Sequence, residues 1–187
     1  YYVIFSQTTL LYPLIRFTNF FQNGLRSRIM KSIEDIKRVH EKVKGPFFAY
    51  LHLEIPHGPF IFGPKGEPLE MNQPLVFMPQ RTDLIEAQFK SLPYYLDHVT
   101  FINLKMKEVV NTILNAAGED SIIIIQGDHG HNYFSEGASV EKVCRSLLSV
   151  LNVVYLPENR SELPSHISSV NTFRVLFNLV FDDNFEI

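Results

Sequence analysis

The sequence predicts an α/β fold, built on a mostly parallel sheet with helices on both of its faces. Short apolar runs, typical of buried strands, alternate along the chain with longer segments whose apolar residues recur at helical spacing. Two of these runs end in polar, histidine-containing turns, as strands do where an open α/β sheet binds a ligand. With 187 residues, 45% of them hydrophobic and 20% charged, the chain is long enough for one domain with a sizeable core.

The first 43 residues predict two helices. Residues 1–24 carry aromatic and aliphatic side chains at near-helical spacing, and we expect Gly24 to end this helix. Polar residues interrupt the segment too often for a membrane span. Residues 27–43 form the clearest amphipathic helix, with Lys and Glu opposite an apolar face. That face consists of Ile29, Ile33, Ile36 and either Val39 or His40.

A buried strand is predicted over residues 47–53, with His52 as a core histidine in its interior. The turn that follows holds His57 between two prolines and a glycine. Because these neighbours stiffen the backbone, the imidazole is positioned before any ligand arrives, which is what a binding site requires. The alternative is a rigid loop in which His57 only caps or packs.

Residues 61–93 are rich in proline and glycine and predict a long irregular segment, typical of a binding rim or lid. A long helix is predicted from Tyr94 to Ala116. Asp97 and His98 are adjacent near its start, but neighbouring helix positions diverge by about 100° around the axis. We therefore do not expect these two residues to face one metal ion.

The strongest functional pattern is the strand predicted at residues 122–125 and the turn after it. Four successive isoleucines indicate a strand buried on both faces. The turn brings one carboxylate, Asp128, together with two imidazoles, His129 and His131. A carboxylate oxygen beside an imidazole nitrogen suits Zn²⁺ or Mn²⁺. The alternative is a polar turn that binds nothing, with His131 in solvent.

The rest of the chain continues the alternation of helices and strands. A short helix is predicted at 141–148, and a third strand at 150–156 that Pro157 ends. A final helix is predicted to run through Asn178, capped by Ser169 or Asn171.

Composition excludes some functions. The net charge is −3 and no block of Lys or Arg occurs, so nucleic acid is not an expected partner. The single cysteine, Cys144, cannot form an internal disulfide. The chain also shows no signal peptide with a basic leading region.

Five pieces of the sequence together resemble the C-terminal part of a sulfatase-like catalytic domain of the alkaline phosphatase superfamily. They span residues 45–181 in the order found in that family. The most similar branch is the bacterial membrane-anchored one that includes phosphoethanolamine transferases and lipoteichoic acid synthases. The resemblance implies an alkaline-phosphatase-like, mostly parallel sheet. The matching pieces are residues 46–60, the helix with Tyr94, Asp97 and Asn103, residues 124–130, residues 151–157 and residues 170–174.

The resemblance also implies roles for four residues. Asp128 and His129 match a pair that binds a divalent cation, typically Zn²⁺, Mn²⁺ or Ca²⁺. His57 matches a catalytic histidine that contacts the substrate phosphate or sulfate, or helps the leaving group depart. His131 extends the motif as a candidate substrate contact. The implied reaction is attack by a metal-activated hydroxyl on a phosphate or sulfate ester, through a covalent intermediate.

The family's nucleophile and its early acidic ligands have no match here. The first carboxylate is Glu34, and Cys144 follows the metal pair and lacks the Cys-x-Pro-x-Arg pattern of sulfatases. We therefore expect residues 1–187 to form a single but incomplete α/β domain, the C-terminal portion of a longer catalytic domain, inactive alone. The upstream part would supply the nucleophile. The alternative is a degenerate α/β domain with only a binding or structural role.

Three further expectations concern partners and location. The partners are a phosphate- or sulfate-ester substrate and the missing N-terminal half of the same polypeptide. Self-association is expected through apolar surface, above all that of the Phe-rich residues 1–21. By resemblance, the protein is expected at the extracytoplasmic face of the cell membrane.

Overall fold

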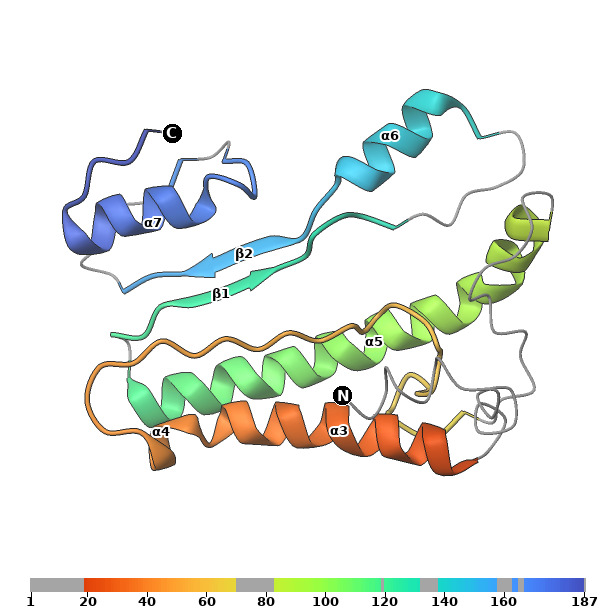
Figure 1. Cartoon of the computed structure of the whole chain (residues 1–187), viewed down its shortest axis with the longest axis horizontal. Helices are drawn as coiled ribbons and strands as arrows, with labels where there is room; N and C mark the ends of the chain where they lie inside the picture. Colours follow the sequence, from red (N-terminus) through yellow and green to blue (C-terminus); the bar gives the residue numbers. More distant parts are fainter. Residues whose placement is uncertain are drawn as a thin grey trace, which may run out of the picture. The chain divides into compact units, whose positions relative to one another are not determined.

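A computed structural model describes most of the chain (Figure 1). It divides into two compact units, Tyr1–Thr112 and Ile113–Ile187, and each is described here by itself. Side chains of residues 19–21 and 83–90 are outside the description. The described residues are 19–69, 83–118, 120–131, 138–157, 163–164 and 167–186.

The first unit contains α3 (Asn19–Lys37), the short α4 (Val39–Lys42) and most of α5 (Asp83–Ala117). Helix α3 continues through Gly24, so the expected helix end at this residue is wrong. A glycine inside a helix costs only about 1 kcal/mol relative to alanine, which packing of the apolar face readily outweighs. The expected helix over 27–43 is divided instead at Arg38.

Helix α5 begins at Asp83, well before the expected start at Tyr94, and Pro93 lies inside it. The predicted irregular segment is therefore wrong for residues 83–93, while residues 70–82 lie outside the described part. Residues 61–69 form a tight reversal in which Phe62 bridges Pro68. The Gly63 N–H donates to the Glu67 carbonyl at 2.8 Å, and the Leu69 N–H donates to the Ile61 carbonyl at 3.1 Å.

Residues 47–53 are extended but pair with no strand among the described residues, so the predicted strand is not formed there. His52 is exposed rather than part of the core. Phe48 and Tyr50 are 77% and 76% exposed. An apolar segment becomes a β-strand only when a neighbouring strand provides hydrogen-bond partners for its backbone. The residues of the segment do not specify whether such a neighbour is present.

The core of the first unit holds the segment that carries His57. Ile55, Ile61, Phe62 and Phe101 are buried together, and the rings of Phe62 and Phe101 stack with centroids 4.4 Å apart. Residues before and after His57 are thus fixed by apolar contacts. Partly buried residues of α3, α5 and the extended segment pack on this cluster: Leu25, Ile29, Met30, Leu53 and Ile102.

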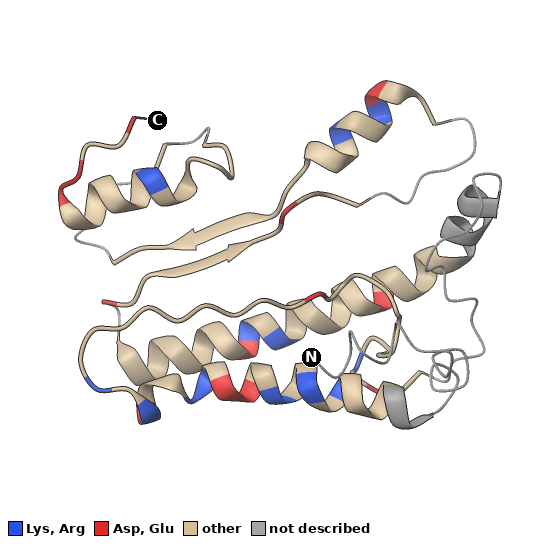
Figure 2. Ribbon diagram, viewed as in Figure 1, with Lys and Arg blue, Asp and Glu red and all other residues tan. Residues whose placement is uncertain are grey.

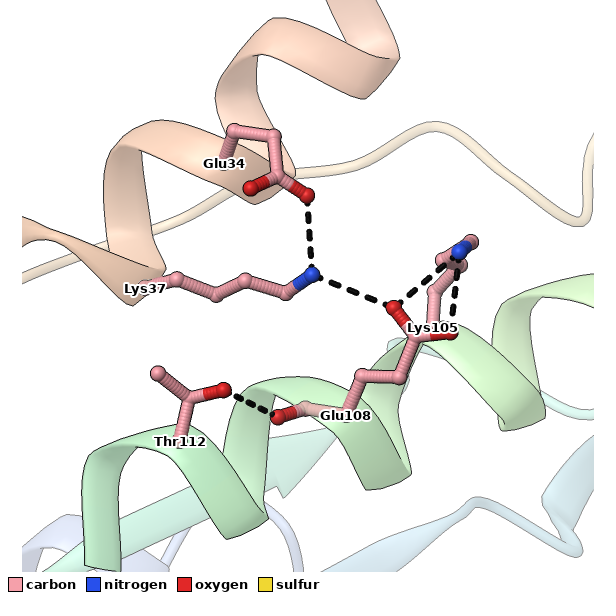
Figure 3. A network of polar contacts seen from close by, with 5 residues as sticks. All are labelled: Glu34, Lys37, Lys105, Glu108 and Thr112. Atoms are coloured by element: carbon pink, nitrogen blue, oxygen red, sulfur yellow. Dashed lines mark hydrogen bonds and ion pairs between the residues drawn. The ribbon is translucent and has the colours of Figure 1, made fainter. Parts of the chain in front are cut away.

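A charged network links α3 to α5 (Figure 3). Lys37 Nζ donates to Glu34 Oε1 at 2.8 Å and to Glu108 Oε2 at 3.1 Å, and Lys105 Nζ contacts both Glu108 oxygens. Hydrogen bonding to Glu34 is the main reason the pKa of Lys37 is raised, and bonding to Lys105 is the main reason the pKa of Glu108 is lowered. Figure 2 shows that charges of both signs line α3, whereas β1 and β2 carry none.

We expect the Lys37–Glu108 pair to contribute a coupling free energy of only about 0.5–1 kcal/mol in a Lys37→Met, Glu108→Gln double-mutant cycle, because water screens the exposed carboxylate. Urea unfolding at low and high salt measures it, and salt should reduce it. The coupling should vanish as pH falls through the lowered pKa of Glu108 or rises through the raised pKa of Lys37. A salt-independent coupling would contradict this.

The second unit contains β1 (Ile123–Gln126), α6 (Val140–Leu148), β2 (Asn152–Tyr155) and α7 (Thr172–Phe181). The two strands pair antiparallel, with Ile123 opposite Tyr155 and Gln126 opposite Asn152. This is the one strand pair among the described residues. Helices together with a small sheet are consistent with the predicted α/β class. The predicted parallel sheet stays a prediction. The strand isoleucines are half-buried rather than buried on both faces.

The predicted helix at 141–148 is confirmed by α6, where Ser139 Oγ accepts the Lys142 N–H at the N-cap. Asn171 occupies the N-cap position of α7, but its side chain makes no capping hydrogen bond. Helix α7 runs past the expected Asn178 to Phe181. Within the described ranges, no helix combines the length and apolar character needed to cross a membrane.

Candidate functional site

The turn after β1 is fastened at both ends by backbone hydrogen bonds. The Gly127 N–H donates to the Leu151 carbonyl at 2.9 Å, just beyond the last paired residues of β1 and β2. The Gly130 N–H donates to the Leu147 carbonyl in the last turn of α6 at 2.8 Å. Asp128 and His129 lie between these two anchors.

Gly130 lies against the C-terminal end of α6. A Cβ at this position would overlap the Ser146 carbonyl oxygen and lie 2.9 Å from the Ser149 carbonyl oxygen. Both obstacles are backbone atoms of an ordered helix end, which cannot rotate away as a side chain does. The turn therefore requires glycine here, for close approach to the helix.

Hydrogen bonds within the turn orient the side chains of Asp128 and His129, and with them the oxygen and nitrogen atoms that could bind a metal ion. Asp128 Oδ1 accepts the His129 N–H at 3.0 Å. His129 Nδ1 lies 2.7 Å from the Gly130 carbonyl oxygen, and because that oxygen can only accept, Nδ1 carries the proton. The lone pair of the neutral imidazole is then on Nε2, 3.8 Å from Asp128 Oδ2.

These two atoms fit one divalent cation. Ligand atoms each about 2.0–2.1 Å from Zn²⁺ lie within about 4 Å of one another, and the 3.8 Å separation satisfies this limit. Both side chains are accessible, with Asp128 91% and His129 57% exposed. Among the described residues, no cluster of three or more His, Cys, Asp or Glu side chains could complete the ligand set. The pair thus offers part of a metal site.

His131 is exposed and its Nε2 lies 2.7 Å from Ser146 Oγ, so it joins the turn to α6. The cluster expected from the sequence is therefore divided. Asp128 and His129 direct donor atoms toward each other, whereas His131 is engaged with the helix. Its expected role as a substrate contact stays a prediction.

His57 belongs to the first unit, whereas the other three candidate residues belong to the second. Its N–H donates to the Glu54 carbonyl at 2.8 Å, and its Nδ1 lies 2.7 Å from the Gly58 carbonyl oxygen. By the same reasoning as for His129, Nδ1 carries a proton and Nε2 is the nitrogen that can exchange one with a ligand. The imidazole is exposed.

Sequence reasoning missed a buried histidine beneath this turn. His98 is 1% exposed, and its Nε2 accepts the N–H groups of Ile61 and Phe62 at 2.9 and 3.1 Å. The sequence placed His98 correctly on a helix, but no motif marks a histidine that binds backbone from a distant segment.

Comparison with known proteins gives a family match. The family model described as Sulfatase matches residues 8–166. No curated protein and no solved structure matches the chain. Sulfatase-like domains act on sulfate or phosphate esters as hydrolases or transferases, and they generally use divalent metal ions. Because the match covers well over half of its residues, the chain belongs to the sulfatase family.

Proposed function

We propose that this chain is part of a metal-dependent hydrolase or transferase of phosphate or sulfate esters, with Asp128 and His129 supplying two of the metal ligands. One observation carries the proposal. Asp128 Oδ2 and His129 Nε2 are 3.8 Å apart, and the Gly130 carbonyl fixes the histidine tautomer that leaves Nε2 able to bind a metal. The sulfatase family match supports the same assignment.

In this proposal Asp128 and His129 would help to hold the cation, Zn²⁺, Mn²⁺ or Ca²⁺, and the bound ion would lower the pKa of a hydroxyl nucleophile and stabilise negative charge on the ester. His57 is the catalytic histidine. Held by its Nδ1–H to the Gly58 carbonyl, it presents Nε2, which in the imidazolium form donates a proton to an ester oxygen or to the leaving group. His131, beside Ser146 at the edge of the turn, is proposed as a secondary substrate contact.

The nucleophile is proposed to come from a polypeptide segment upstream of this chain, together with the remaining acidic ligands. Glu34 is the first carboxylate of the sequence, and it is engaged with Lys37 in the α3–α5 network. A relationship to membrane-anchored phosphoethanolamine transferases and lipoteichoic acid synthases, and with it an extracytoplasmic location, belongs to the same proposal. So does self-association through exposed apolar surface, expected above all at the Phe-rich residues 1–21, whose side chains lie outside the described part of the chain.

Calorimetric titration of the 187-residue chain with Mn²⁺, repeated with Zn²⁺, tests the metal assignment. We expect micromolar binding, about −8 kcal/mol, with one ion per chain. Asp128→Ala and His129→Ala should each weaken it at least tenfold, because a single remaining ligand cannot hold the ion. Asp183→Ala and His52→Ala are matched controls, since they remove an exposed carboxylate and an exposed imidazole elsewhere. Both controls should bind as the unmodified chain does.

If the control variants weaken metal binding as much as Asp128→Ala and His129→Ala do, the measured heat comes from general binding to the protein surface. That result would reject the Asp128–His129 assignment. Absence of binding to the 187-residue chain has two explanations, ligands that are missing with the upstream segment or a degenerate domain with a binding or structural role, and would move the test to a longer polypeptide. In that longer protein, Asp128→Ala must abolish hydrolysis of a phosphate or sulfate ester if the proposal is correct.

A further inference from the structure

We propose that His98 is a positioning residue, which fixes the turn that carries His57 by accepting two backbone hydrogen bonds as a neutral imidazole. The contact itself is independent of the proposed function. Only its significance, the placement of a catalytic His57, rests on that proposal.

The first argument is the hydrogen bonding at Nε2. The Ile61 and Phe62 N–H groups both point to this one atom, at 2.9 and 3.1 Å. Since amides can only donate, Nε2 must be unprotonated. Replacing it with an apolar atom would leave two buried donors without a partner, which costs more than the bonds contribute.

The second argument is that His98 contacts the turn on both sides of His57. The amides of Ile61 and Phe62 follow His57 in the chain, while the carbonyls of Pro56 and of His57 itself also interact with the imidazole. Nδ1 has no hydrogen-bond partner among the described residues, so the hydrogen bonds of His98 to this segment are the two at Nε2. His98 therefore holds the backbone that follows His57 through Nε2, while the carbonyls of Pro56 and His57 lie near the ring.

The surroundings keep the ring neutral and in place. The edge of Phe60 and the tilted ring of Phe62 contact His98, with centroids 5.1 and 6.1 Å away. Burial lowers the pKa of His98 to about 4, against the weaker opposing effect of the Pro56 and His57 carbonyls.

Ionisable groups near His98 come from three elements. From α3, Arg26 donates to the Ile61 carbonyl at 3.2 Å. Asp97 precedes His98 on α5 and is half-buried, and Tyr94 of the same helix stacks on Phe60. In the turn itself, Glu54 and His57 are exposed.

Amide hydrogen exchange and NMR of the full 187-residue chain test the proposal. His98→Phe keeps a ring without the acceptor, whereas His98→Gln keeps a neutral acceptor that does not titrate. In His98→Phe we expect exchange at Ile61 and Phe62 to accelerate at least tenfold and the His57 ring signals to broaden. Amides of α3 such as Ile33 should change less than twofold. His98→Gln should restore both the protection and the sharp His57 signals.

Acidification gives a second test that does not depend on whether His98→Phe folds. In the unmodified chain, protection at Ile61 and Phe62 should be lost as pH falls through about 4, before protection at Ile33 is lost. In His98→Gln this early loss should be absent. Unchanged His57 signals in a folded His98→Phe variant, or the same acid transition in His98→Gln, would overturn the proposal. Neither experiment needs metal or substrate, so a failure here is distinct from a failure of the metal assignment.

Discussion

Replacing Gly130 with alanine is expected to destabilise the second unit by about 3 kcal/mol, the upper end of the usual cost of overpacking. The added Cβ would overlap the Ser146 carbonyl oxygen and crowd the Ser149 carbonyl oxygen, and both belong to the end of α6. To relieve the overlap, the turn must leave the helix and lose the bond from Gly130 to Leu147. Urea unfolding monitored by circular dichroism measures the change.

Gly127→Ala is the matched control, three residues earlier in the same turn. A Cβ there would meet no atom closer than 3.7 Å, which is ordinary van der Waals contact. We expect this variant to change the free energy of unfolding by less than about 0.5 kcal/mol. If both variants unfold at the same urea concentration, the close contact between Gly130 and the end of α6 is contradicted. Metal titration of a folded Gly130→Ala variant would also show whether that contact shapes the Asp128–His129 pair.

Phe101→Ala is expected to cost about 3–5 kcal/mol, the range found when a buried aromatic residue is truncated. Phe101 is 1% exposed, its ring stacks on Phe62, and it also lies against Gly66 of the tight reversal. Its removal leaves a cavity directly under the segment that His98 holds. Thermal and urea unfolding measure the loss, and the His57 ring signals should broaden in the same variant.

Phe48→Ala provides the comparison for an equal change in side-chain volume. Phe48 is 77% exposed, so its truncation removes little buried surface and should shift the free energy of unfolding by less than about 0.5 kcal/mol. A Phe48→Ala variant as unstable as Phe101→Ala would mean that the extended segment 47–53 is covered, by self-association or otherwise. Sedimentation of both proteins at several concentrations distinguishes these cases.

Local patterns predicted the elements of the second unit well. The isoleucine run became β1, the helix expected at 141–148 became α6, and the strand expected at 150–156 contains β2. Each of these elements depends on the spacing of apolar residues, and on the residues that begin and end the element, within about ten positions. The antiparallel direction in which β1 and β2 pair depends instead on which segments of the chain meet. Strand formation at residues 47–53 depends on this too, because these residues have strand composition but no strand neighbour among the described residues.

The sequence indicated which residues make up the candidate site, but not how they are arranged in space. A carboxylate beside an imidazole after a strand indicated Asp128 and His129, and both direct donor atoms toward each other. Nothing in the sequence indicated that α6 would press on Gly130, or that His98 would bind the backbone of a segment more than thirty residues away. Such contacts depend on tertiary packing, which residue spacing does not encode.

The repetitive composition of β1 has a consequence for how its alignment is encoded. The three isoleucines of β1 offer the same apolar surface at every position, so hydrophobic contacts would be nearly unchanged if the strand slipped along its partner. Polar side chains at the end of the ladder remove this ambiguity. Gln126 donates to the Ser169 carbonyl at 3.0 Å, and its partner Asn152 donates to the buried Thr172 hydroxyl at 3.1 Å. A slip of β1 by one residue would move Gln126 away from the Ser169 carbonyl and displace Asp128, so this uncharged polar contact defines where the Asp128–His129 pair begins.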